Sequence, residues 1–159
     1  MDEEFREIDL EDFVKVNRSF VSGRRAERAM NVRYFLNDKG DLKASVYFEK
    51  GSEGPPGHAH GGATAAVIDE AMGLACWFKM IPVVTKTLTT HFLKMIPIGT
   101  KAVITTELTE GEGKYIIASS TLFDQKSGAE YARGEGIYRR ISLSKLSGMP
   151  DLKIEMNGE

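Results

Sequence analysis

The segment from residue 61 to residue 79 limits the fold more than any other part of the sequence. It reads GGATAAVIDEAMGLACWFK, contains no proline before Pro82, and predicts a helix about 27 Å long. Between Ala63 and Phe78 the only charged residues are Asp69 and Glu70. Because a helix that is apolar on almost every side is buried on almost every side, the rest of the chain must wrap around it.

Patterns typical of β-strands surround this helix. Two short alternating runs, 32–36 and 46–48, flank a cluster of turn-forming residues at 37–41 and predict a β-hairpin. After the helix, four stretches separated by Gly-containing turns predict an antiparallel meander, near 85–96, 100–108, 114–123 and 129–141. No second long helix is available to cover the first. We therefore expect an α+β fold in which an antiparallel sheet of about six strands wraps around one long buried helix.

The last predicted strand carries three small residues, Ala132, Gly134 and Gly136, on one face. Glycine inside a strand often marks a close approach by another backbone, so we expect this strand to offer a contact surface for a second copy of the chain. The whole chain, 1–159, is expected to be a single domain. We expect residues 1–28 to form an N-terminal arm with a short helix at 12–17, and residues 143–159 to form a frayed tail.

Charge and cysteine content narrow the possible function classes. The 21 Lys and Arg residues against 23 Asp and Glu give a formal net charge of −2, which lacks the basic bias of a nucleic-acid binder. Cys76 is the only cysteine, so neither an intramolecular disulfide nor a CxxC zinc site is possible. The acidic start lacks the features of a secretory signal, and no apolar run is long enough for a membrane span. We expect a cytoplasmic protein that binds no nucleic acid.

The start of the long helix is the first candidate site. His60, Gly61 and Gly62 follow a Gly/Pro-rich loop at 50–59. The first N–H groups of a helix have no intrahelical partners and attract anions or polarised oxygens, and two glycines leave room for such an atom to approach. An ordinary flexible entry to a helix is the alternative, and the glycine pair taken alone favours it.

Asp69 is the second candidate, because a buried carboxylate is costly unless it is paired or chemically used. Glu70 is rotated by about 100° around the helix, so one carboxylate is expected to face a cleft and the other a salt bridge or solvent. Asp69 lies close to two full turns after Gly62 and falls on the side of the glycine pair. A carboxylate in a poorly solvated cleft can act as base or nucleophile. Pairing with Arg133 or Arg139 is the alternative.

The stretch GPPGHAHGGATAAVIDEAMG closely resembles the loop and helix signature of hotdog-fold thioesterases, in the HGG branch that includes the phenylacetate-pathway enzymes. The similarity continues through TKTLTTHFLKMIPIGT and ARGEGIY and covers residues 30–141. It implies hydrolysis of an acyl-CoA thioester to a free acid and coenzyme A, without a metal or redox cofactor. It also implies a homodimer, paired further into a homotetramer, with each site shared between two subunits.

The resemblance assigns a role to each matching residue. Asp69 matches the catalytic acid, and Gly61 matches the glycine whose N–H polarises the thioester carbonyl. His60 matches the motif histidine that shapes the loop, and Thr85 matches a hydroxyl residue that holds the attacking water. The sequence departs from some relatives at Gly54, where they carry an asparagine.

Further residues are candidates for substrate binding: Gly62, His58, Lys86 and Lys94. The two lysines, like the pairs Arg24-Arg25 and Arg139-Arg140, are either solvated surface or contacts for the phosphates of coenzyme A. His58 either presents its imidazole at the cleft or faces solvent. A metal site made of His58, His60 and Asp69 is a weaker alternative, since two loop histidines need a rigid third ligand. Cys76 lacks the basic neighbour that a nucleophile needs.

Two other functions fit the same fold, because fold alone does not determine function. A hydratase or dehydratase acting on acyl thioesters would need a differently placed histidine, and that spacing is missing here. A non-catalytic acyl-CoA-binding or scaffold protein would show no turnover, whereas an enzyme would lose its turnover on Asp69→Asn substitution.

Overall fold

The computed structural model describes residues 4–12, 20–22, 30–142 and 144. The described chain contains one long helix and a sheet in which every strand pair is antiparallel. No helix among these residues is both long and apolar enough to cross a membrane. The elements, in chain order, are β1 Arg6–Ile8, a 3₁₀ turn Leu10–Asp12, β2 Asn31–Leu36, β3 Leu42–Tyr47, a 3₁₀ turn Lys50–Ser52, α1 Gly61–Phe78, β4 Val83–Phe92, β5 Lys101–Glu110, β6 Tyr115–Asp124 and β7 Glu130–Arg140.

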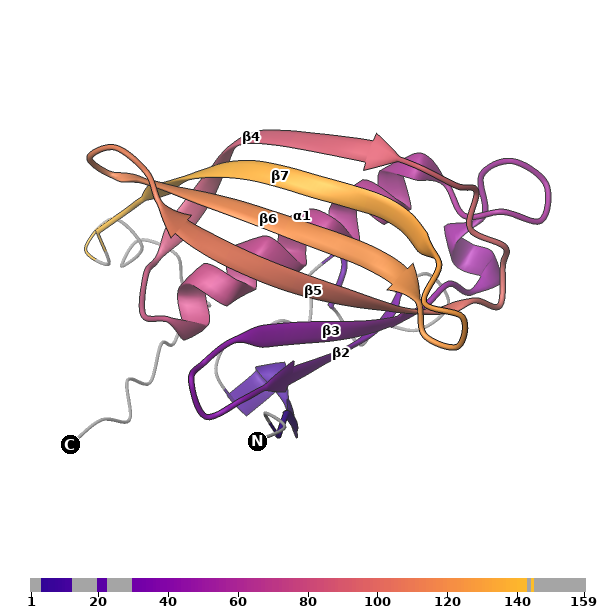
Figure 1. The fold of residues 1–159 in the computed structure, drawn as a ribbon, viewed down its shortest axis with the longest axis horizontal. Coiled ribbons are helices and arrows are strands. Elements are labelled where there is room, and N and C mark those ends of the chain that lie inside the picture. The colour runs from indigo at the N-terminus through magenta and orange to yellow at the C-terminus, as the bar shows by residue number, and fades with distance from the viewer. Residues whose placement is uncertain (1–3, 13–19, 23–29, 143, 145–159) are drawn as a thin grey trace.

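The described strands form one sheet of seven in the order β1-β2-β3-β5-β6-β7-β4. Figure 1 shows this sheet curving around α1, which lies along one of its faces. The helix carries the chain from β3 across the sheet to its far edge, where β4 pairs only with β7. The predicted α+β hotdog architecture, with its hairpin, long helix and four later strands, is confirmed.

The core lies between α1 and the concave face of the sheet. Val67, Ile68, Ala71, Met72 and Cys76 are buried along the helix. Alternate residues of the strands meet them, as period-2 patterning predicts: Ala44, Val46, Ile104, Ile116, Ala118, Leu122 and Ala132. The sheet curves around the helix and thus covers its apolar surface.

The N-terminal region contains a strand that the sequence does not predict. β1 pairs with β2, with Ile8 opposite Tyr34, and Ile8 and Leu10 pack against the core. A 3₁₀ turn covers Leu10–Asp12, and the rest of the short helix expected at 12–17 lies outside the described residues. The tail expected at 143–159 also lies outside them, apart from residue 144.

The glycines of β7 face inward, which corrects the expectation of a contact surface for a second chain. β7 is an internal strand between β6 and β4. A β-carbon at Gly134 would overlap the Ile68 side chain of α1, and one at Gly136 would overlap the ring of Tyr138. The close approach comes from side chains of the same chain, because the helix packs directly on this strand.

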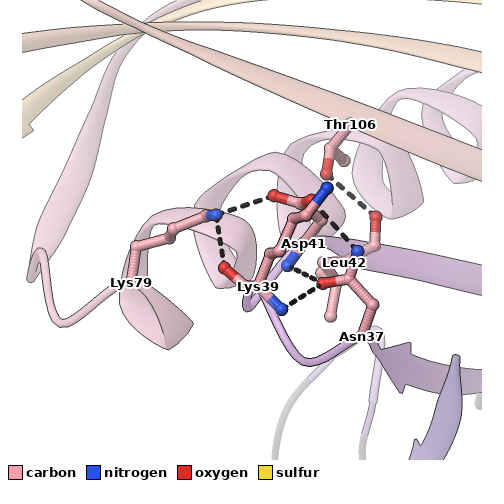
Figure 2. Close-up of polar contacts among 6 residues, drawn as sticks. All are labelled: Asn37, Lys39, Asp41, Leu42, Lys79 and Thr106. Carbon is pink, nitrogen blue, oxygen red and sulfur yellow. Dashed lines mark hydrogen bonds and ion pairs between the residues drawn. The ribbon is translucent and has the colours of Figure 1, made fainter. Parts of the chain in front are cut away.

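The C-terminal end of α1 is held to the turn between β2 and β3 (Figure 2). The Lys79 ammonium donates to the carbonyl of Lys39 at 2.8 Å and to the Asp41 carboxylate at 2.7 Å. The Asn37 side chain closes the turn by accepting from the backbone N–H groups of Lys39 and Asp41. The hairpin is thereby fixed to the end of the helix opposite the candidate site.

Candidate active site

His60 caps the start of α1. Its extended backbone stands just before the helix, and its Nδ1 accepts the N–H of Gly62 at 2.8 Å. Among the described residues the N–H of Gly61 has no hydrogen-bond partner. The cap therefore uses one of the first two amides of the helix and leaves the other available at its positive end.

Gly54 and Gly62 both make room for His60. A β-carbon at Gly54 would lie 2.7 Å from Cα of His60, and one at Gly62 would lie 2.9 Å from its Nδ1. At Gly61 the nearest atom would be a carbon of the Phe92 ring at 3.5 Å, an ordinary contact. The glycine that stands where some relatives carry asparagine is thus required by the packing of His60.

Asp69 receives two hydrogen bonds on one oxygen. Its Oδ1 accepts from the Thr85 hydroxyl at 3.0 Å and from the Tyr138 hydroxyl at 2.7 Å. Its Oδ2 has no partner in the described part of the chain. The alternative pairing with an arginine does not occur, because Arg133 pairs with Glu130 and Arg139 makes no ion pair with a described residue. The carboxylate is therefore held at Oδ1 and open at Oδ2.

A bulge in β4 brings Thr85 to this carboxylate. The pairing of β4 with β7 shifts register between Thr85 and Thr87, which leaves Lys86 as the extra residue. Side chains at positions an odd number apart point to opposite faces of a regular strand. Thr85 and Phe92 are seven positions apart, yet both contact the helix side, because the bulge lies between them. The bulge thus directs one side chain of β4 to Asp69 and another to Gly61.

Tyr138 is a site residue that the sequence analysis missed. It lies on β7, is only 1% exposed, and its hydroxyl lies 3.2 Å from the Asp69 carbonyl as well as 2.7 Å from Oδ1. Burial and the adjacent Asp69 carboxylate raise its pKa well above the ordinary range, so the phenol stays protonated and donates. The available sequence signal was Gly136, which lies two residues before Tyr138 on the same face of the strand and leaves space for its ring.

Glu70 faces away from this cluster, as the helix phase predicts. It accepts a hydrogen bond from the Ser22 hydroxyl, which also lies 2.9 Å from the hydroxyl of buried Tyr34. Burial, followed by the charge of Glu70, raises the pKa of Tyr34 far above its ordinary value. The two adjacent carboxylates therefore occupy separate environments.

The remaining substrate-binding candidates do not gather at Asp69. The His58 ring turns back to its own loop, with Nδ1 3.0 Å from the carbonyl of Pro56. Lys86 lies over the Tyr115 ring, with its Nζ 4.4 Å from the ring centroid, and Lys94 is exposed. Within the described ranges no three His, Cys, Asp or Glu side chains cluster as metal ligands would.

Cys76 is fully buried on α1. Burial raises the pKa of its thiol to about 11, so near neutral pH the sulfur carries its proton. A thiol in this state is a poor nucleophile.

Comparison with known proteins relates this geometry to a family. Residues 56–131, which include the cap, Gly61, Asp69 and Thr85, match the family model described as the Thioesterase superfamily. Over this segment the chain resembles the thioesterase superfamily. Human acyl-coenzyme A thioesterase THEM5 is 30% identical over 107 residues, which cover 66% of this chain and 43% of that protein. The chain thus spans less than half the length of this relative.

Two solved structures share the fold. The E. coli PaaI protein of the phenylacetic acid degradation operon superposes with a TM-score of 0.64 at 18% identity, covering 70% of this chain and 80% of that one. The smu.793 protein of Streptococcus mutans, solved with acetyl CoA bound, gives a TM-score of 0.62 at 17% identity, covering 89% and 92%.

Proposed function

We propose that this chain hydrolyses an acyl-CoA thioester to a carboxylic acid and coenzyme A. The observation that carries the proposal is the Asp69 carboxylate, held at Oδ1 by Thr85 and Tyr138 while Oδ2 has no described partner. The acyl-coenzyme A thioesterase name of the human relative and the acetyl CoA bound to the Streptococcus mutans protein support the substrate class.

The proposed chemistry uses two groups of the chain. The Gly61 N–H donates to the thioester carbonyl, and the positive end of α1 stabilises the negative charge that develops on this oxygen. Asp69 Oδ2 either attacks the carbonyl carbon or removes a proton from a water that attacks it. The carbon–sulfur bond then breaks, the thiolate of coenzyme A leaves and takes up a proton, and the acyl group ends as the acid.

Gly61 begins α1 and Asp69 lies near its middle, so we propose that each site combines two subunits. The eight positions from Gly61 to Asp69 correspond to about 12 Å along the helix axis, too far for both residues to serve one carbonyl. In the described chain β4 is an edge strand, with its outer edge unpaired by any other strand. Apolar side chains that are 48% to 58% exposed lie along it and its following loop: Val84, Phe92, Leu93 and Met95. Such an edge favours pairing with a second copy.

Antiparallel pairing of two β4 strands would complete the site. A two-fold axis near the middle of β4 sets the Thr85 end of one strand beside the Phe92 end of its partner. Thr85 contacts Asp69, and Phe92 lies against Gly61. The Asp69 of one subunit thereby approaches the Gly61 of the other. A dimer assembled this way has two equivalent sites, and further pairing into a tetramer stays a prediction.

The proposal is tested by thiol release from a panel of acyl-CoA esters that differ in chain length and aromatic character. We expect turnover of at least one ester by the wild-type chain and its loss in Asp69→Asn, with affinity for the ester retained. Glu70→Gln is the matched control, because it makes the same change at the neighbouring carboxylate and should keep activity. No turnover of any ester, or full turnover by folded Asp69→Asn, would refute the proposal.

One turnover in isotopically labelled water tests direct attack by Asp69. If Asp69 attacks the carbonyl and water then opens the acyl–Asp69 anhydride at the aspartyl carbon, the first molecule of acid carries an unlabelled oxygen from Asp69. If Asp69 acts as base, or if water opens the anhydride at the acyl carbon, the first molecule of acid is labelled. An unlabelled first acid therefore identifies Asp69 as the nucleophile.

A further inference from the structure

We propose that Tyr138 is a positioning residue for Asp69, fixing the carboxylate through Oδ1 so that Oδ2 is the reacting oxygen. This inference rests on the proposed role of Asp69 and adds to it. Tyr138 belongs to β7, 69 positions further along the chain than Asp69, and outside residues 56–131 that match the superfamily.

The two contacts of the Tyr138 hydroxyl fix more than the side chain of Asp69. The hydroxyl lies 2.7 Å from Oδ1 and 3.2 Å from the backbone carbonyl of the same residue. Thr85 donates to Oδ1 from β4 at 3.0 Å. Donors from two strands thus converge on one oxygen and set the rotation of the carboxylate. Oδ2, which has no partner among the described residues, is left as the oxygen directed at the substrate.

The surroundings of Tyr138 show how its ring is held. A β-carbon at Gly136 would overlap the ring, so glycine at this position lets the ring lie against its own strand. On the helix side, a β-carbon at Gly73 would lie 3.8 Å from the ring. The residue is only 1% exposed, so other groups of the protein surround the ring. Two glycines and burial therefore keep the hydroxyl on Asp69.

The titratable groups around the carboxylate are few. Tyr138 faces Asp69 from β7, and its raised pKa keeps it a donor at neutral pH. Cys76, one of the groups near Tyr138, is a protonated thiol, and from β4 the contact is the neutral Thr85 hydroxyl. Among described residues no ion pair reaches Asp69, so the hydroxyls of Tyr138 and Thr85 are the described side-chain groups that hold its carboxylate.

The test is Tyr138→Phe in the full chain, assayed by thiol release on the ester that the wild-type protein hydrolyses fastest. We expect kcat to fall about tenfold or more, because a misplaced catalytic group is costly. KM should stay nearly unchanged. This split between kcat and KM is the readout of a positioning role, because a general loss of packing at the site would raise KM as well.

Tyr34→Phe is the matched control. Tyr34 is also buried and also bonds through its hydroxyl, but to Ser22 rather than to Asp69. It should leave kcat and KM as in the wild type. A folded Tyr138→Phe protein with unchanged kcat would overturn the inference, as would an equal fall of kcat in Tyr34→Phe.

A second variant serves if Tyr138→Phe does not fold. Replacing Tyr138 by 3-fluorotyrosine keeps the ring and the hydroxyl but makes the hydroxyl a stronger donor. Because the hydroxyl is kept, kcat should then stay near the wild-type value, and a fall as large as that expected for Tyr138→Phe would overturn the inference. Asp69→Asn separates the two claims: if it remains active, the proposed function fails, whereas if it is inactive and Tyr138 variants behave as wild type, only the inference fails.

Discussion

Gly62 donates its backbone N–H to Nδ1 of His60 at 2.8 Å, and the preceding amide, that of Gly61, has no partner among the described residues. Two adjacent glycines at one helix start therefore differ in what they do. Gly62 belongs to the cap, where a β-carbon would lie 2.9 Å from the histidine ring. Gly61 presents its amide outward beside Phe92, and this difference separates the effects of substitutions at the two positions.

Replacing Gly61 by valine should lower kcat by about 100-fold or more, the effect of losing one oxyanion donor. The side chain blocks the approach of the carbonyl to the N–H. The fold should persist, because a β-carbon at this position meets only the exposed Phe92 ring at 3.5 Å. Steady-state thiol release and a thermal unfolding curve check both parts. Wild-type kinetics in a well-folded variant would exclude the role.

Replacing His60 by alanine should lower the free energy of unfolding by about 1 kcal/mol, the usual cost of losing an N-cap. His60→Asn is the control, because an asparagine oxygen can accept the Gly62 N–H in place of Nδ1. Urea titrations of the three proteins measure the difference. Equal stability of His60→Ala and the wild type would show that the cap contributes nothing.

The contact between Asp41 and Lys79 should make stability depend on pH in the acid range. The hydrogen bond from Lys79, helped by one from Asn37, holds the pKa of Asp41 below its ordinary value of 3.8. Since the folded pKa lies below the unfolded one, the contribution is complete above about pH 4 and is lost as the pH falls further.

Asp41→Asn should therefore be less stable than the wild type at pH 7 by about 0.5 kcal/mol, a modest value because the pair is partly solvent-exposed. The difference should shrink as the pH falls below about 4. Glu112→Gln, at an exposed turn, is the control for loss of one negative charge. A difference that grows as the pH falls would contradict the assignment.

Much of the fold was predictable because its patterns are local. The apolar run 61–78 and the alternation on each side of the 37–41 turn report burial directly. β1 was not predictable in this way, since only three residues pair, and Ile8 is the one that packs against the core. The β7 glycines were read as a site for another backbone, because the sequence does not show that Ile68 and Tyr138 fill the space.

From the residues alone the candidate site was predictable only where it lies within one segment, and Thr85 was named only through the family resemblance. His60, Gly61 and Asp69 are close in the chain, so their spacing carries information. Thr85 reaches Asp69 because of a bulge at Lys86, and nothing in the run TKTLTT marks which residue is extra. Tyr138 reaches Asp69 only through the position of β7 in the sheet. Contacts that depend on the tertiary topology leave no local sequence pattern that would predict them.

The central claim, a thioester-hydrolysing site built from Asp69 of one chain and Gly61 of another, is tested most directly by complementation. Inactive Asp69→Ala and inactive Gly61→Val chains are mixed under conditions that allow subunit exchange, and thiol release is measured. Random pairing into two-fold dimers should restore about a quarter of wild-type activity, because half of the dimers are mixed and each holds one intact site of two. No recovery after proven exchange would contradict the shared site.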